Sequence, residues 1–163
     1  MNETAAPHRH HFLYFADPMC SWCYGFSPVI RQLTGAFADR VGLRIVMGGL
    51  RAGNTQAMRE KDRTYIRDAW TRVGEASGQP FDFAFFERET FTYDTEPACR
   101  AVVAMRQMAP DKALGFLGQV SAAFYATNRD TTDIEVLSDI AAEVGEDRAA
   151  FHELVTSGEA KAE

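Results

Sequence analysis

The stretch that decides the fold reads FLYFADPMCSWCYGF and spans residues 12–26. Its first part is an apolar run of the kind that forms a buried β-strand. A turn containing Asp17 and Pro18 follows, and after it Cys20 and Cys23 stand three residues apart at a predicted helix start. Side chains three apart on a helix share one face, with Cβ atoms about 5–6 Å apart, so a small adjustment brings the sulfurs within disulfide reach. Such a pair can open and close without unfolding the protein, as reversible thiol–disulfide exchange requires.

The position of Cys20 makes it the expected nucleophile. The first N–H groups of a helix lack intrahelical partners, and with the helix dipole they carry about half a positive charge. Because the thiolate is the attacking species, Cys20 is predicted to attack, and Cys23, one turn further in, to resolve the mixed disulfide. Ser21 is expected to donate a hydrogen bond to the thiolate or to help cap the helix. Trp22 either offers an apolar surface to a substrate or packs on the turn.

Three other interpretations of the cysteine pair stay open at this point: a structural disulfide, half of a zinc site, and two unrelated buried cysteines. The polar residues 1–11 contain no predicted secretory signal, and a four-ligand zinc site needs a second pair of ligands. Cys99, the third cysteine, has no neighbouring ligand motif and is expected to be free and buried. The strand before the pair and the helix after it favour redox chemistry, without a cofactor or a metal.

Of the residues in the preceding turn, Pro18 is expected to support the pair. Pro18 restricts the backbone just before Cys20. Asp17 either points inward, where its charge raises the pKa of a thiol, or shapes the Asp-Pro turn with its side chain.

The length suits either one domain with a core or a small domain with an insertion, and the composition indicates a soluble globular protein. Hydrophobic residues make up 46% of the 163 residues and charged residues 25%, which is ordinary for such proteins. The net charge of −6, without a basic run, argues against nucleic acid as a partner. No apolar run approaches the roughly 20 residues of a membrane span, so we expect a cytoplasmic protein without membrane contact, in a compartment where free thiols are the rule.

The pattern along residues 11–53 predicts a βαβ unit, with strands over 11–16 and 41–47 and a helix over 20–38. The crossover in such units is nearly always right-handed, and Pro28 is expected to kink the helix. Ligands of open α/β sheets gather at the carboxyl ends of the strands, which is where the cysteine pair falls. Residues 1–10 are expected to form a flexible tail.

Residues 54–163 are predicted to form a helical domain. Helices are expected over residues 55–77, 95–108, 111–127, 133–144 and 147–155. The aromatic residues of segment 81–86 are expected to pack between helices, with a substrate-facing groove as the alternative.

Three segments together resemble the DsbA family, specifically its cytoplasmic FrnE-like branch. They read DPMCSWCYGF (17–26), VMGGLR (46–51) and YDTEPACRA (93–101). The resemblance implies a thioredoxin-like α/β fold with a helical domain inserted into it. It also implies dithiol–disulfide exchange through Cys20 and Cys23 with a protein or small-thiol substrate. Residues 47–50 resemble the family's strand end beside the active site.

One departure from that family concerns the end of the sequence. In the family, the chain returns from the helical domain to the sheet through a loop with a cis-proline. Here the last proline is Pro110, and the sequence reaches Glu163 in helical composition, so the resemblance predicts that the C-terminal half of the thioredoxin sheet is missing. Two strands alone make a marginal sheet with an uncovered edge. We therefore expect a homo-oligomer joined near the βαβ unit.

Two alternatives to a disulfide oxidoreductase remain open. One is a chaperone-like or peptide-binding module in which the thiols have little part. The other is a glutathione-dependent transferase or isomerase of the related kappa type, which tends to carry serine where Cys20 stands here.

Overall fold

The computed structural model describes residues 10–158 and 160. The expected flexible tail lies outside the described residues, except for its last residue, which opens the first strand. The helices and strands are β1 (His10–Ala16), α1 (Ser21–Ala36), β2 (Val41–Met47), α2 (Glu60–Ser77), the 3₁₀ turn η1 (Phe83–Glu87), α3 (Glu96–Met108), the 3₁₀ turn η2 (Pro110–Lys112), α4 (Ala113–Thr127), α5 (Ile134–Glu143) and α6 (Arg148–Thr156).

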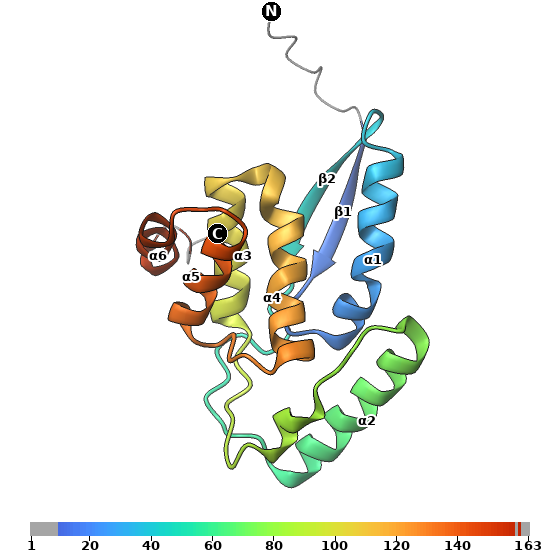
Figure 1. Cartoon of the computed structure of the whole chain (residues 1–163), viewed down its shortest axis with the longest axis vertical. Helices are drawn as coiled ribbons and strands as arrows, with labels where there is room; N and C mark the ends of the chain where they lie inside the picture. Colours follow the sequence, from blue (N-terminus) through green and yellow to red (C-terminus); the bar gives the residue numbers. More distant parts are fainter. Residues whose placement is uncertain (1–9, 159, 161–163) are drawn as a thin grey trace, which may run out of the picture.

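The predicted βαβ unit is confirmed. Strands β1 and β2 pair in parallel, with Phe12 opposite Leu43 and Tyr14 opposite Ile45. They lie side by side between α1 and α4 (Figure 1). Alternate residues of a strand point to opposite faces, and the ring of Tyr14 contacts that of Phe26 on α1. One face of the sheet is therefore covered by α1.

Helix α1 is shorter than expected at both ends. It begins one residue later, because Cys20 has extended backbone and occupies the N-cap position. It ends at Ala36, because the Phe37 carbonyl accepts N–H bonds from both Arg40 and Val41, which turns the chain into β2. The helix continues through Pro28 without interruption.

Helix α2 begins five residues later than predicted. The preceding segment is instead extended: the Met58 N–H donates to the Phe91 carbonyl at 2.9 Å, and Ala57 forms an antiparallel bridge with Thr92. This pairing joins positions more than 30 residues apart. The local sequence around residues 55–59 therefore could not predict it.

The remaining helices agree with their predicted positions, with small shifts at their starts. Helix α4 begins at Ala113, because the chain first forms the 3₁₀ turn at Pro110. Helices α5 and α6 start one residue later than expected, since Asp133 and Asp147 are their N-caps and accept backbone N–H bonds.

The aromatic segment packs between helices, as expected. Trp70 on α2 is 1% exposed, and its indole contacts aromatic rings from the segment and from α4. Those rings include Phe85, Phe86 and Tyr125. This aromatic cluster holds α2 against the rest of the fold, and α2 in turn contacts α1.

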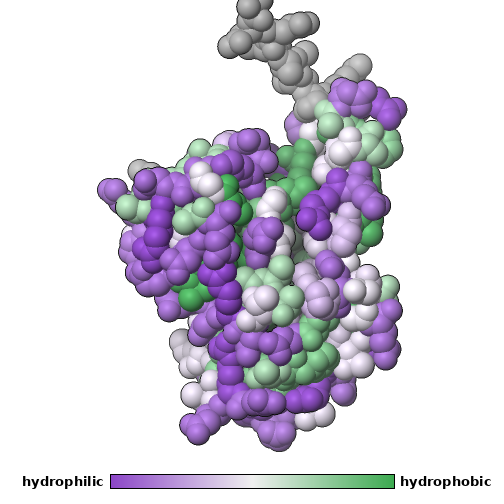
Figure 2. Space-filling model, in the orientation of Figure 1, coloured by the Kyte–Doolittle hydropathy of each residue, from purple (hydrophilic) through white to green (hydrophobic). Residues whose placement is uncertain are grey.

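One face of the small sheet is left open. Leu13 and Phe15 on β1 are 59% and 66% exposed, on the face opposite Tyr14. Hydrophobic residues are visible where the strands lie, between α1 and α4 (Figure 2). Within the described residues, β1 has β2 as its single strand partner. No helix in this part of the chain is both long and apolar enough to cross a membrane.

Candidate redox site

The cysteine pair lies just beyond the carboxyl end of β1. A tight turn links strand and helix, in which the Cys20 N–H donates to the Asp17 carbonyl at 3.1 Å. Cys20 and Cys23 are half-buried, Cys99 is buried, and all three are free thiols. Pro18 is buried in the turn. The structure thus places the pair at the helix mouth that its spacing predicts.

The two thiols of the pair have opposite acidities. A hydrogen bond with the Cys23 side chain is the largest influence on Cys20, and N–H bonds from the backbone of Trp22 and Cys23 add to it. Together they outweigh burial and lower the pKa of Cys20 from 9.0 to about 6. The same sulfur–sulfur hydrogen bond, helped by burial, raises the pKa of Cys23. At neutral pH the arrangement holds one thiolate and one thiol.

Asp17 fulfils both of its predicted roles. Its side chain is 3% exposed, and Oδ1 accepts the Met19 N–H at 2.8 Å, which shapes the turn. Its Oδ2 accepts the Leu50 N–H at 2.7 Å from the loop after β2. Its charge raises the pKa of Cys20, although less than the other influences on that thiol.

Cys99 also belongs to this junction, which its sequence position did not reveal. Its thiol lies 3.5 Å from Asp17 Oδ2, as a donor. Burial is the largest cause that raises the pKa of Cys99, and the Asp17 charge adds to it. Cys99 is therefore free and buried, as expected.

A pair of tyrosines supports the turn from the helical domain. The Tyr93 hydroxyl donates to the Met19 carbonyl at 2.7 Å and lies 3.2 Å from the Tyr125 hydroxyl. Both side chains are buried, and burial raises the pKa of each. Sequence reasoning missed this support, although Tyr93 opens one of the three segments that carry the family resemblance.

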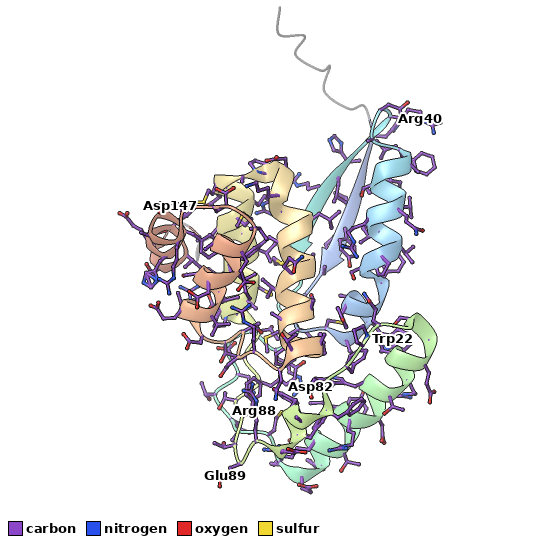
Figure 3. The ribbon with its side chains drawn as sticks, in the orientation of Figure 1. Trp22, Arg40, Asp82, Arg88, Glu89 and Asp147 are labelled. Atoms are coloured by element: carbon purple, nitrogen blue, oxygen red, sulfur yellow. The ribbon has the colours of Figure 1, made fainter. Side chains whose placement is uncertain are left out.

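A pocket of about 270 Å³ opens beside Cys20. Trp22, Leu50 and Tyr65 line it and are 57%, 63% and 66% exposed. Trp22 lies where the start of α1 approaches α2 (Figure 3). The Arg51 and Arg72 side chains supply positive charge to the same pocket. The pocket can therefore receive an apolar group and an anionic group next to the reactive sulfur.

Ser21 is the predicted site residue with the least support from the geometry. The N-cap is Cys20, and it has no side-chain capping bond, so Ser21 does not cap the helix.

Within residues 10–158 and 160, no group of three or more acidic, histidine or cysteine side chains could hold a metal ion. The half-zinc interpretation of the pair therefore gains no second set of ligands from the described part of the chain.

A family model described as thioredoxin matches residues 13–163. The chain belongs to the thioredoxin family. This membership accounts for the parallel strand–helix–strand unit with two cysteines at its helix start, and the predicted thioredoxin-like fold with an added helical domain is confirmed.

Solved structures of disulfide enzymes share this fold. A candidate protein disulfide isomerase from Nitrosomonas europaea is 34% identical, with a TM-score of 0.85, and the match covers 93% of this chain and 72% of that one. The cytosolic disulfide reductase DsbM from Pseudomonas aeruginosa is 26% identical, with a TM-score of 0.74 and the same coverage. DsbM has also been solved with GSH. The resemblance to the DsbA family is thereby confirmed.

The curated relatives are named as adapter proteins and not as disulfide enzymes. The ClpXP adapter protein SpxH from Halalkalibacterium halodurans is 26% identical over 153 residues, which cover 91% of this chain and 50% of that protein. The chain thus spans about half the length of the curated relatives it matches.

Proposed function

We propose that this chain catalyses thiol–disulfide exchange through Cys20 and Cys23. The observation that carries the proposal is the pair of opposite acidities at the mouth of α1, where one sulfur is a thiolate at neutral pH and its neighbour is a thiol. The family and its disulfide-reductase relatives support the same chemistry. The description of DsbM as cytosolic supports a cytoplasmic setting.

The reaction proceeds in two exchanges. The Cys20 thiolate attacks one sulfur of a substrate disulfide; a bond forms between these sulfurs, and the other substrate sulfur leaves as a thiolate that takes up a proton. Cys23 then loses its proton and attacks the Cys20 sulfur, which releases the second substrate thiol. Two electrons have passed from the pair to the substrate. In the reverse direction the pair is reduced and the substrate becomes a disulfide.

The pocket beside Cys20 favours a small anionic thiol such as glutathione as one exchange partner. Arg51 and Arg72 can attract carboxylates there, because opposite charges attract more strongly in a partly buried site. The glutathione-bound structure of DsbM supports this choice. The apolar rim of Trp22, Leu50 and Tyr65 suits a protein segment equally well.

A trapping experiment tests the proposed chemistry. In Cys23→Ser the second exchange is blocked, so incubation with oxidised glutathione should leave Cys20 in a stable mixed disulfide, visible as a mass increase of one glutathionyl group. Cys20→Ser should give no such adduct, and Cys99→Ser should behave like the parent chain. An adduct that forms as readily in Cys20→Ser would assign the reactive sulfur elsewhere.

A second candidate function is that of a binding module. The SpxH relatives are named as adapter proteins, and this chain exposes Leu13, Phe15 and other apolar side chains. Binding to purified ClpXP that persists in Cys20→Ser would favour this function. Redox cycling without binding to ClpXP would argue against the binding module and favour the enzymatic proposal.

We also propose that the chain forms a homo-oligomer through β1. Within the described residues, β2 is the strand that pairs with β1, and Phe15 lies exposed on the open face of β1. A second copy could add its own β1 there, in a self-complementary contact of the kind that dimers use.

The oligomer prediction is tested by light scattering after size exclusion. We expect at least twice the chain mass of 18.2 kDa, and a shift towards the monomer in Phe15→Asp. Tyr65→Asp is the matched control, because both side chains are 66% exposed but Tyr65 lies on α2. A parent chain that is monomeric at every concentration rules the oligomer out.

A further inference from the structure

The loop after β2 carries Arg51 to the pocket beside the redox pair. Three hydrogen bonds tie this loop to residues 93–95, the segment that leads into α3. The bond that involves Arg51 runs from its backbone N–H to Oγ1 of Thr95, over 3.1 Å. The same segment reaches the turn before the cysteines, where the Tyr93 hydroxyl donates to the Met19 carbonyl at 2.7 Å. Residues 93–95 thus hold two sides of the pocket together.

The hydroxyl of Thr95 serves this loop and not its own helix. Thr95 is the N-cap of α3, yet its side chain makes no capping hydrogen bond there, although capping is the usual role of a threonine in this position. The residue is fully buried. Its oxygen accepts the Arg51 N–H instead, which fixes the backbone from which the guanidinium extends.

The side chain of Arg51 is held as well as its backbone. Its guanidinium lies 5.2 Å from the centre of the buried Tyr93 ring, and a cation is attracted to the face of an aromatic ring. Arg51 is half-buried, whereas Arg72, the second arginine of the pocket, is exposed. A charge that is partly withdrawn from water attracts an anion more strongly and is screened less by salt. Of the two arginines, Arg51 is therefore the better placed to bind an anion.

We propose that Arg51 is the residue with which the site selects anionic thiol substrates such as glutathione, and that Thr95 is the positioning residue that holds Arg51 at the pocket. The inference rests on the proposed exchange reaction, and it assigns different weights to the two arginines. Arg51 binds a carboxylate of the substrate, and Arg72 contributes little. An arginine in a fixed position suits this task, because its planar fork can bind a carboxylate through two parallel N–H bonds.

The test compares an anionic disulfide with an uncharged one. In Cys23→Ser, attack by Cys20 breaks the disulfide bond of the reagent, leaves one half bound to the Cys20 sulfur and releases the other half as a thiolate. Intact-mass measurements over time count the adducts with oxidised glutathione and with bis(2-hydroxyethyl) disulfide. The measured quantity is the ratio of the first rate constant to the second. A change in the acidity of Cys20 alters both rate constants and so cancels in this ratio.

Arg51→Met, made in the Cys23→Ser chain, keeps an apolar stem and removes the charge. We expect the ratio to fall by about 10- to 100-fold, which is the effect of losing one charge-assisted hydrogen bond. Arg67→Met is the matched control and should leave the ratio within about twofold, because exposed charges are well screened. The Arg67 guanidinium also lies over an aromatic ring, 4.8 Å from the centre of Phe86, but outside the pocket. A loss in Arg72→Met as large as that in Arg51→Met would overturn the assignment.

Thr95→Val tests the positioning role, because valine has the shape of threonine without the hydroxyl. The Arg51 N–H then loses its acceptor, and we expect the ratio to fall by about 3- to 10-fold. Thr95→Ser keeps the hydroxyl and should restore the ratio. If Thr95→Val slows both disulfides equally and leaves the ratio unchanged, Thr95 only stabilises the fold and its positioning role is wrong.

A second variant covers the case in which Arg51→Met or Thr95→Val folds poorly. Arg51→Gln removes the charge but keeps a polar side chain, and it should lower the ratio as Arg51→Met does. A Cys23→Ser chain that reacts with neither disulfide would defeat the proposed function and this inference together. A chain that reacts with both, and whose ratio survives the loss of the Arg51 charge, would defeat this inference alone.

Discussion

At the scale of single residues, two thiols separated by two positions have different chemistry because one lies outside the helix and one inside it. Cys20 is the N-cap and receives hydrogen bonds from the first turn, including one shared with the Cys23 thiol. Cys23 is further in and acts as its donor. The charge on one sulfur is thus stabilised by the proton on the other, and the second proton is released when the mixed disulfide needs resolving.

Alkylation of the reduced protein tests this difference directly. Since the pKa of Cys20 is lowered to about 6, its reaction with iodoacetamide should reach half its maximal rate near pH 6 and level off above neutrality. Cys23→Ala removes the sulfur-bound donor and should move the midpoint upward, towards the ordinary value near 9. Cys23→Ser keeps a donor and should move it less. A parent midpoint above pH 8 would contradict the described site.

The hydroxyl of Tyr93 is expected to stabilise the turn before Cys20. Tyr93→Phe deletes the donor to the Met19 carbonyl and leaves a buried acceptor unpaired, which costs about 1–3 kcal/mol of unfolding free energy. Denaturant unfolding of the reduced protein measures the loss. Tyr65→Phe, at a side chain that is 66% exposed, should be neutral. Equal effects of the two substitutions would argue against the Tyr93 hydrogen bond.

At the scale of elements, α1 is the helix that both the redox pair and the helical domain depend on. It carries the cysteines at its start, covers one face of the sheet, and packs against α2 and α4. Its extent was predictable within two residues, because an apolar strand precedes the cysteines and an apolar stripe at helical spacing follows them. The start of α2 was not, since the extended segment before it pairs with Phe91 and Thr92, far along the chain.

The contact between α1 and α2 depends on Gly25. A Cβ atom there would lie 2.7 Å from Cγ1 of Val73, which is fully buried and β-branched, so it has little freedom to turn away. Gly25→Ala should destabilise the protein by about 1–3 kcal/mol. Gly35→Ala on the same helix meets no atom within 4 Å and should stabilise it by about 0.5–1 kcal/mol. Thermal unfolding of both variants measures the contrast, which would be absent if the helices packed less closely.

At the scale of the whole molecule, the chain brings residues from both predicted regions to one site. The spacing of Cys20 and Cys23, with the strand before them, predicted a cysteine pair at a helix start, and the resemblance of three segments to the DsbA family predicted the fold class. The supports were not predictable, because they join distant positions: Asp17 to Leu50 and Cys99, and Tyr93 to Met19. Single polar residues carry no periodic signal, so their contacts become visible only once the helices are packed.

The central claim is that the two sulfurs exchange two electrons with a thiol partner while the fold stays intact. Equilibration of the protein in glutathione buffers of graded composition, followed by alkylation and intact-mass measurement, tests it most directly. The account predicts one cooperative transition between a form with both Cys20 and Cys23 alkylated and a form with neither, unchanged in Cys99→Ser and absent in Cys20→Ser. Two thiols that stay alkylatable in every buffer, or that are lost independently of each other, would contradict it.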